Sequence, residues 1–269
     1  MEKGELIGQG RTAEVYAWGE GRILKLYQSW MPAYVVEREY QITRAVYAAG
    51  APAPAVDALV ESEGRYGIVF ERIAGVSLLV ELQKKPWRML TYARLMGELH
   101  AQMHACHAPA ELPAQRQRIE FGIDGAEGLA DADKQAVRRC LERLPDGESL
   151  CHGDFHPDNI LMSPRGPIII DWLTGTRGDP LADVARTALL LHTGGLPPGT
   201  PAPVRMLINL SRTWLYASYL HRYRQLRPAR RQEIDRWRLP IFAARLEEVK
   251  AYPQEKQLLL GKLKSMLRD

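Results

Sequence analysis

Residues 151–159 read Cys-His-Gly-Asp-Phe-His-Pro-Asp-Asn, and Asp171 stands twelve positions after Asn159. Two short, mainly apolar runs connect them: 159–162, which begins with Asn159, and 167–171, which ends with Asp171. Ser-Pro-Arg-Gly at 163–166 separates the two runs. Apolar runs of this length around a Pro/Gly turn predict a β-hairpin. The stretch therefore predicts an irregular polar loop followed by a hairpin that carries Asn159 at one end and Asp171 at the other.

This spacing of acidic and amide side chains indicates a specific chemistry. An aspartate, an asparagine five residues later and a second aspartate across a short hairpin form the arrangement that phosphoryl transfer from ATP requires. Asp154 would then take the proton of the acceptor group. The amide oxygen of Asn159 and the carboxylate of Asp171 would hold Mg²⁺ against the phosphates, because Mg²⁺ prefers oxygen ligands.

A glycine-rich segment near the N-terminus supports this interpretation. Residues 8–15 read Gly-Gln-Gly-Arg-Thr-Ala-Glu-Val, with Gly8 and Gly10 at the first two glycine positions and Ala13 at the third. The dinucleotide-binding version of such a string lies between a strand and a helix, whereas strand-like residues follow it here. We therefore expect a loop inside a β-hairpin, folded over the phosphates of a nucleotide.

A lysine and a glutamate in the same region are expected to pair. Lys25 lies within the apolar run 23–27, and Glu39 shares a helical stripe with Val35, Ile42 and Val46. An unpaired charge on a core-facing stripe would be costly. Pairing Lys25 with Glu39 removes both difficulties and would fix the ammonium group beside the phosphates; Glu37 is the fallback partner.

The order of predicted elements gives an α+β chain in two lobes. Strands are expected near 6–7, 15–18, 23–27, 55–61 and 66–71 and a helix over 33–49 that ends at Gly50, which together make a small antiparallel sheet with one helix over residues 1–74. The remainder, 75–269, reads as a mainly helical lobe, with helices near 89–106, 130–144, 181–192 and from 204 onward. The Pro/Gly-rich stretch 194–203 is expected to be a surface loop.

Composition limits the class of protein and its partners. The chain has 269 residues, 46% hydrophobic and 25% charged, which is typical of a soluble globular protein. Its three cysteines show no metal-ligand or disulfide spacing, and no apolar run is long enough to span a membrane. We expect a cytoplasmic protein with no membrane partner. A formal net charge of +4 is too small to indicate a nucleic-acid partner.

Several other polar and aromatic residues have alternative interpretations. We expect Asp183 to anchor the loop at 151–159 by hydrogen bonds. His100 and His104 are spaced like a metal pair, but no third ligand is evident in the sequence, which favours packing. In the C-terminal part, the aromatic side chains that could line an acceptor pocket, or equally pack in the core, are Trp214, Tyr216, Tyr219, Tyr223 and Trp237.

With these motifs together, the sequence resembles the aminoglycoside phosphotransferase and choline kinase group of kinase-like small-molecule phosphotransferases. The resemblance extends over residues 6–192 and is carried by 151–170, by Asp-Trp at 171–172, by Gly-Asp-Pro-Leu-Ala-Asp-Val-Ala at 178–185, and by 36–39 and 50–54. It implies a bilobal protein-kinase-like fold that uses ATP (or GTP) and Mg²⁺. It also implies that Asp154 is the catalytic base, that Asn159 and Asp171 bind the metal, and that adenine meets the backbone of a hinge between Glu71 and Ile73.

The acceptor implied by this resemblance is a hydroxyl of a small molecule, such as an amino alcohol, a sugar or an antibiotic. Residues 201–269 hold 15 Lys and Arg against 6 Asp and Glu, which disfavours a polycationic acceptor such as an aminoglycoside. Two alternatives remain: a catalytically weak nucleotide-binding regulatory protein of the same fold, and an atypical protein kinase. Only eleven residues separate Asp171 from Asp183, which leaves no room for a kinase activation segment.

Overall fold

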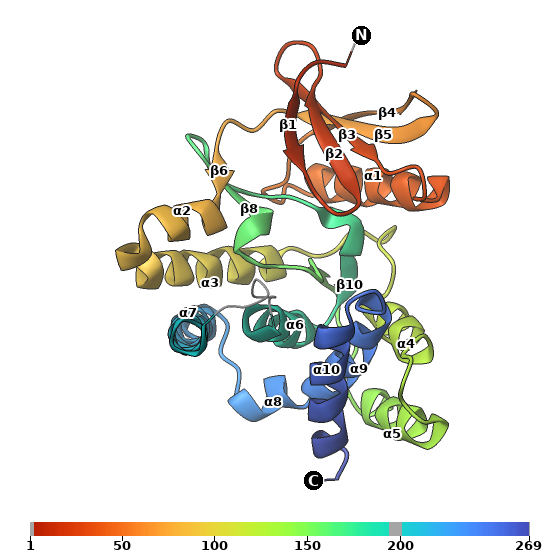
Figure 1. Ribbon diagram of the computed structural model, residues 1–269, viewed down its shortest axis with the longest axis vertical. Coiled ribbons are helices and arrows are strands. Elements are labelled where there is room, and N and C mark those ends of the chain that lie inside the picture. The colour runs from red at the N-terminus through yellow and green to blue at the C-terminus, as the bar shows by residue number, and fades with distance from the viewer. Residues whose placement is uncertain (1–2, 194–200, 269) are drawn as a thin grey trace. The chain divides into compact units, whose positions relative to one another are not determined.

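The computed structural model describes residues 3–193 and 201–268, which divide into two compact units (Figure 1). The first unit comprises residues up to Lys84 together with Pro109–Leu112 and Pro157–Gly175, and the second comprises the rest. The chain therefore passes between the two units several times. The predicted lobe boundary between residues 74 and 75 stays a prediction.

The first unit is built on a five-stranded antiparallel sheet with the order β1-β2-β3-β5-β4. Its elements are β1 (Leu6–Gln9), β2 (Ala13–Ala17), β3 (Arg22–Tyr27), α1 (Ala33–Ala48), β4 (Val56–Ser62) and β5 (Arg65–Glu71). All five strands and the helix match the predicted order and nearly the predicted bounds. Helix α1 ends where Gly50 adopts a φ of +79°, as expected for a glycine just beyond a helix C-terminus.

The sheet has two apolar faces because its side chains alternate between them. Ala13, Tyr27, Ile68 and Phe70 lie on one face and pack with Val36 of α1, which covers that face (Figure 1). On the other face the buried cluster consists of Leu24, Leu26 and Val69. This alternation places Lys25 on the face that α1 covers, because Lys25 is two residues from Tyr27.

A second, three-stranded sheet completes the first unit. Strands β8 (Ile160–Ser163) and β9 (Gly166–Ile169) form the predicted hairpin, and β6 (Val76–Ser77), which the sequence did not predict, pairs with β8. The remaining elements are α2 (Leu78–Lys84) and the short 3-10 helices η2 (Pro157–Asn159) and η3 (Trp172–Thr174). Contacts of η3 with α1 join this sheet to the larger one.

The second unit is mainly helical, as predicted. Its helices are η1 (Pro86–Arg88), α3 (Met89–Ala105), α4 (Gln115–Asp124), α5 (Asp131–Glu142), α6 (Pro180–Thr193), α7 (Ala202–Leu226), α8 (Arg231–Asp235), α9 (Arg238–Glu248) and α10 (Pro253–Met266). This unit also contains two short strands that the sequence did not predict, β7 (Ser149–Cys151) and β10 (Thr176–Gly178), which pair with each other. Three-residue strands are too short to show periodicity.

Two further observations concern the loop and membrane expectations. Of the predicted surface loop at 194–203, residues 194–200 lie outside the described residues, and α7 begins at Ala202. Among the helices of the described ranges, none combines the length and the apolar character needed to cross a membrane.

Candidate functional site

In the first unit, Lys25, Glu39 and Asp171 form one charged cluster. The ammonium Nζ of Lys25 donates to Oε1 of Glu39 at 2.6 Å and to Oδ1 of Asp171 at 3.0 Å. Glu39 is 1% exposed on the buried face of α1, whereas Glu37 is exposed, so Glu39 and not the fallback is the partner of Lys25. The cluster thus joins the middle of β3, the core face of α1 and the end of the β8–β9 hairpin.

A tyrosine that the sequence analysis missed completes the surroundings of Glu39. The hydroxyl of Tyr27 donates to Oε2 of Glu39, so both carboxylate oxygens are bonded inside the core. Strand alternation could have revealed this residue, because Tyr27 is on the same face of β3 as Lys25. Two donors on one buried carboxylate fix its position more firmly than the lysine alone.

The charge state of Lys25 follows from its two acidic neighbours. Burial by itself lowers the pKa of a lysine, but the charges of Asp171 and Glu39 more than offset this and raise the pKa of Lys25 well above its usual value. The ammonium group is therefore charged at neutral pH. The whole Lys25 side chain is 15% exposed.

Asp171 is held in an unusual backbone conformation. Its φ of +65° and ψ of +63° are in the left-handed region, which an aspartate tolerates better than most residues. The buried ring of Trp172, whose Nε1 donates to the carbonyl of Ile169 at 2.9 Å, anchors the turn directly after it. The side chain of Asp171 is 44% exposed, so its carboxylate points out of the core beside Lys25.

Asn159 lies at the same end of the hairpin as Asp171. The register pairs Ile160 with Ile169, and the carbonyl of Asn159 accepts the N–H of Ile170 at 3.0 Å. Asn159 is only 7% exposed. An amide and a carboxylate at one end of a hairpin provide the oxygen donors that Mg²⁺ prefers, so these residues fit a magnesium site.

The glycine-rich segment forms the turn of the β1–β2 hairpin. Gly8 pairs with Val15, which pairs with Lys25, so the three residues form one row across the sheet. A Cβ atom at Gly8 or Gly10 would meet only ordinary contacts, at 3.7 and 3.6 Å, so the fold itself does not demand glycine there. Absence of side chains instead allows another molecule to approach the backbone closely. Ala13, at the third position, is buried in the core.

The expected hinge follows the last strand of the main sheet. Glu71 ends β5, its N–H donates to the carbonyl of Ala55 at 2.9 Å, and its carboxylate pairs with Arg165 at 2.6 Å. Ile73 lies two residues further on and is partly exposed. The backbone at Ile73 therefore leaves the sheet, whereas Glu71 is still part of it.

Asp154 belongs to the second unit, on the loop after β7. Nε2 of His156 lies 3.4 Å from its Oδ2, and both side chains are 29% exposed. Burial by itself raises the pKa of Asp154. The hydrogen bond and charge of His156, together with the charge of Arg186, have a larger opposite effect, so the pKa falls below its usual range. Asp154 is consequently a carboxylate at neutral pH.

The backbone before Asp154 is fixed by Asp183, as expected. Oδ2 of Asp183 accepts the N–H of His152 at 2.6 Å, and Oδ1 accepts the N–H of Gly153 at 2.8 Å. The N–H of Asp154 in turn donates to Nδ1 of His152 at 3.1 Å. Gly153 has a φ of +76°, a conformation that glycine adopts without strain, which explains a glycine directly before the aspartate.

His100 and His104 lie beside the same carboxylate, so Asp183 is a third possible ligand that was not evident in the sequence. Their Nε2 atoms lie 3.2 and 3.3 Å from Oδ2 of Asp183, and Tyr219 and Tyr223 bond their Nδ1 atoms at 2.6 and 2.8 Å. The three groups are close enough for a metal site. Each ring nitrogen nevertheless has a hydrogen-bond partner, which supports the packing role.

The C-terminal aromatic side chains divide by burial. Tyr219, Tyr223 and Trp237 are at most 3% exposed and belong to the core. Trp214 is 57% exposed on α7, and Tyr216 is partly exposed against His192. Of these five aromatic residues, Trp214 and Tyr216 are the ones with an exposed or partly exposed side chain.

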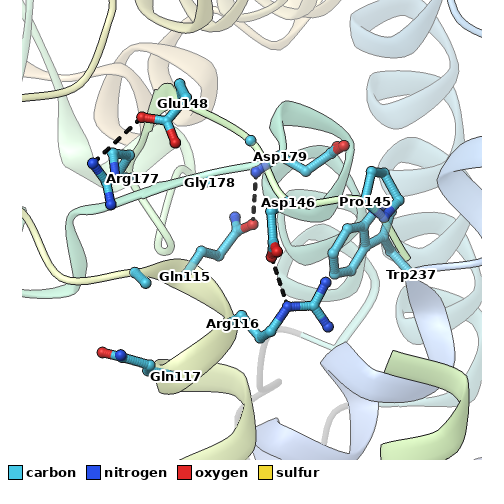
Figure 2. A pocket seen from close by; sticks show the side chains of 12 residues that line it. Gln115, Arg116, Gln117, Pro145, Asp146, Glu148, Arg177, Gly178, Asp179 and Trp237 are labelled. Atoms are coloured by element: carbon cyan, nitrogen blue, oxygen red, sulfur yellow. Dashed lines mark hydrogen bonds and ion pairs between the residues drawn. The ribbon is translucent and has the colours of Figure 1, made fainter. Parts of the chain in front are cut away.

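A pocket of about 270 Å³ in the second unit lies at the other end of β7 (Figure 2). It is lined by the start of α4, residues 145–148, residues 177–179 and Trp237, and the ion pair of Arg116 with Asp146 crosses it at 2.6 Å. Ser149 at this end of β7 pairs with Gly178, whereas Cys151 at the opposite end leads into the Asp154 loop. The pocket is therefore separate from the loop that carries Asp154.

The chain aligns with only a part of each curated relative. The chain is 26% identical over 185 residues to acyl-CoA dehydrogenase family member 10 of Mus musculus, and 27% identical over 187 residues to family member 11 of Homo sapiens. These alignments take in 60% and 58% of this chain but 17% and 23% of the relatives. The chain thus spans about a fifth of the length of these proteins.

Solved structures share the whole fold. A thermostable mutant of aminoglycoside phosphotransferase APH(4)-Ia, in ternary complex with AMP-PNP and hygromycin B, has a TM-score of 0.67 at 17% identity, with 98% of this chain and 92% of that chain covered. A choline/ethanolamine kinase family protein from Mesorhizobium loti has a TM-score of 0.59 at 18% identity, covering 98% and 88%. A putative fructosamine-3-kinase from Haemophilus somnus has a TM-score of 0.65 at 14% identity, covering 100% and 90%.

The predicted α+β, kinase-like architecture is therefore confirmed. A family model described as "Phosphotransferase enzyme family" matches residues 3–226, which is most of the chain and includes every residue predicted to act in catalysis or to bind nucleotide or metal. By its sequence and its fold, the chain belongs to the phosphotransferase enzyme family.

Proposed function

We propose that this protein transfers the γ-phosphoryl group of ATP, or of GTP, to a hydroxyl group of a small molecule. The observation that carries the proposal is that the charged ammonium group of Lys25 is bonded to both the buried Glu39 and the more exposed Asp171. A buried glutamate that holds a lysine beside a second, more exposed acid suits a site for phosphate and metal. Membership in the family and the AMP-PNP complex of a structural neighbour support the same conclusion.

Several residues of the first unit would bind the nucleotide. Lys25, held by Glu39, would contact phosphate oxygens, and the backbone at Gly8 and Gly10 would lie over the phosphates. The row of Gly8, Val15 and Lys25 across the sheet supports this assignment. Adenine would meet the backbone of the segment from Glu71 to Ile73, directly after β5.

Asn159 and Asp171 would hold Mg²⁺ through their side-chain oxygens. When bound, the ion neutralises charge on the phosphates and orients them. The chain's own contribution is to present the two side chains from one end of a rigid hairpin. Lys25 would keep the Asp171 carboxylate in place through the 3.0 Å bond.

Asp154 would orient the acceptor hydroxyl and take its proton as the new P–O bond forms and the bond to the leaving ADP oxygen breaks. A low pKa favours the ionised form of Asp154, which can accept a hydrogen bond from the hydroxyl at neutral pH. Such a carboxylate is a weak base and suits a reaction in which positioning matters more than early proton removal.

The charge of the last part of the chain narrows the class of acceptor. The excess of basic residues after residue 201 disfavours a polycation and leaves amino alcohols, sugars and other small alcohols, with antibiotics as a further class to test. Trp214 and Tyr216 of α7 are the aromatic residues with surface available for a pocket wall. A cationic amino alcohol could bind to such rings by cation–π contact.

Between Asp171 and α6 the chain forms only η3 and β10 before α6 begins at Pro180. A protein kinase places an activation segment here, so the short connection supports a small-molecule acceptor. The regulatory alternative is disfavoured because each position expected to act in transfer holds a competent side chain.

The decisive experiment measures ADP release with MgATP across choline, ethanolamine, homoserine, sugars, aminoglycosides and macrolides. We expect one acceptor class to stimulate release in the wild type. Asp154→Asn should reduce that stimulated rate by roughly 10²–10⁴-fold while nucleotide binding, followed by fluorescence, is retained. Asp131→Asn, an exposed aspartate of α5, is the matched control and should keep wild-type turnover.

Two results would contradict the proposal. Loss of MgATP binding in Asp154→Asn but not in Asp131→Asn would show that Asp154 acts in nucleotide binding and not as the base. MgATP binding without phosphoryl transfer to any acceptor of the panel, with labelled transfer to protein instead, would favour the protein kinase alternative.

A further inference from the structure

Arg186 of α6 is a buried arginine that the sequence analysis did not single out. It is 6% exposed and follows Asp183 by three residues, so both side chains lie on one face of α6. Its Nε donates to the carbonyl oxygen of Gly153 at 3.1 Å. That carbonyl belongs to the peptide unit that joins Gly153 to Asp154.

The peptide unit before Asp154 is therefore bonded on both sides. Its C=O accepts from Arg186, and its N–H, which is the amide of Asp154, donates to Nδ1 of His152. The preceding amide, that of Gly153, is held by Asp183. Because only three rotatable bonds (N–Cα, Cα–Cβ and Cβ–Cγ) connect this peptide unit to the carboxylate of Asp154, the position of the carboxylate depends on how firmly the unit is fixed.

Arg186 is itself fixed by the C-terminal helices. Its guanidinium pairs with Oε2 of Glu248 at the end of α9, and that oxygen also accepts from Arg245 at 2.6 Å. Arg245 in turn contacts Glu255 of α10 at 3.1 Å. A continuous chain of charge-assisted bonds thus runs from α10 through α9 and α6 to the peptide unit before Asp154.

From this geometry we infer that Arg186 is a positioning residue for Asp154, and that Glu248 holds Arg186 in the orientation this requires. The inference rests on the proposed function, in which Asp154 meets the acceptor. The family match ends at residue 226, so Glu248, Arg245 and Glu255 all lie in the part of the chain beyond it. Helices α9 and α10 would therefore contribute to the reaction through the backbone of the loop.

The charge of Arg186 also favours the ionised, proton-accepting form of Asp154. It is one of the groups that lower the pKa of Asp154, so its removal also weakens the preference for the ionised carboxylate. Asp183 and Arg186 have different roles: the first accepts amide hydrogens of the loop, and the second donates to its carbonyl.

The test compares Arg186→Met, Arg186→Lys and Glu248→Gln with the wild type. Arg186→Met should lower kcat by roughly 10- to 100-fold, because displacement of a reacting group by about 1 Å has an effect of this size. The KM for MgATP should stay within roughly threefold, because nucleotide contacts are unchanged. Arg186→Lys keeps the charge and should recover part of kcat. The kcat of Glu248→Gln should lie between those of the wild type and Arg186→Met.

Arg116→Met is the matched control. Arg116 is also a partly buried arginine of the second unit that bonds backbone carbonyls, those of Leu141 and Leu144, at 2.7 Å. Its loss should lower the melting temperature without changing kcat. Where Arg186→Met does not fold, Arg186→Lys and Glu248→Gln carry the comparison.

Hydrogen–deuterium exchange of the peptide covering residues 151–159 provides a readout that needs no turnover. Exchange should be faster in Arg186→Met and unchanged in Arg116→Met. Equal exchange and equal kcat in Arg186→Met and the wild type would overturn the inference, as would the same changes in Arg116→Met. If the wild type transfers no phosphoryl group, the proposed function fails, and the exchange data alone decide whether Arg186 fixes the loop.

Discussion

The ammonium group of Lys25 donates to Oδ1 of Asp171 at 3.0 Å, although 146 residues separate the two in the sequence. Lys25 also donates to Glu39, so one cation joins a strand, a helix and a hairpin. In a low-dielectric setting such a cluster is stable only when all its members are present. Its integrity can therefore be tested one residue at a time.

Glu39→Gln should weaken both nucleotide use and stability. The amide has one acceptor oxygen in place of two and brings no charge to Lys25, so the ammonium group loses its buried counter-ion. We expect kcat/KM for MgATP to fall by about 10- to 100-fold and the free energy of unfolding to fall by on the order of 1–3 kcal/mol. Urea denaturation and steady-state kinetics measure the two effects.

Glu37→Gln is the control for this substitution, because Glu37 is on the same helix with its side chain exposed. It should be close to the wild type in both measurements. If Glu37→Gln and Glu39→Gln were equally active, the pairing of Lys25 with Glu39 would have no part in nucleotide use.

Gly153→Ala tests the backbone conformation before Asp154. At a φ of +76° an alanine is strained by about 1 kcal/mol, and relief of that strain would rotate the Gly153–Asp154 peptide unit. Gly50→Ala imposes a similar strain at a φ of +79°, where an added Cβ meets no atom within 4 Å. Both variants should lose similar stability in thermal melts, but only Gly153→Ala should lose turnover. Equal turnover in the two variants would show that this peptide unit tolerates rotation.

His156→Asn should raise the pKa of Asp154. The hydrogen bond and the charge of His156 both lower this pKa, so their removal moves it upward, toward the ordinary value of about 3.9. Because the pKa in the folded state is depressed, the stabilising contribution of ionised Asp154 is present above that ordinary value and is lost as the pH falls.

A carbon-13 NMR titration of the aspartate carboxyl groups, assigned with Asp154→Asn, measures the shift directly. The exposed His221, replaced by asparagine in the same way, should leave the titration of Asp154 unchanged. An unchanged pKa of Asp154 in His156→Asn would mean that other charges near the carboxylate, such as those of Arg186 and His152, lower it instead.

The buried His104 should make the protein less stable in mild acid. Burial, together with the neighbouring His100, lowers the pKa of His104 to about 3, so it stays neutral while the same residue in the unfolded chain binds a proton below about pH 6.5. The unfolded state then holds more protons, and stability falls as the pH drops from about 6.5 toward 3. Between about pH 6.5 and pH 4.5 we expect a loss on the order of 2 kcal/mol from this residue.

His104→Gln should flatten the pH dependence of the free energy of unfolding in that window, although it lowers stability at neutral pH by breaking the bonds to Asp183 and Tyr223. Burial raises the pKa of Asp183, but the histidine hydrogen bonds outweigh this effect and the pKa lies well below its usual value. Asp183 therefore changes the free energy of unfolding with pH only below about pH 4. A slope in His104→Gln as steep as in the wild type would assign the acid sensitivity to other groups.

The amino-acid sequence by itself determined the local features of this protein. Alternation of apolar residues predicted the five strands of the main sheet, and Gly50 predicted the end of α1, because these depend on neighbouring residues along the chain. The spacing of Asp154, Asn159 and Asp171 predicted the chemistry, and the local pairing of β8 with β9 is enough to bring Asn159 and Asp171 to one end of a hairpin.

Only the tertiary structure decided which distant groups meet. The pairing of β6 with β8 and of β7 with β10, the tyrosine partners of His100 and His104, and the bonds of Arg186 to Gly153 and Glu248 all join segments far apart in the sequence. Strands of two or three residues carry no periodicity, and an arginine on a helix has the same local signature whether it ends in solvent or on a carbonyl. Such contacts arise when burial removes water from polar groups, which must then find partners among whatever the packed fold brings near.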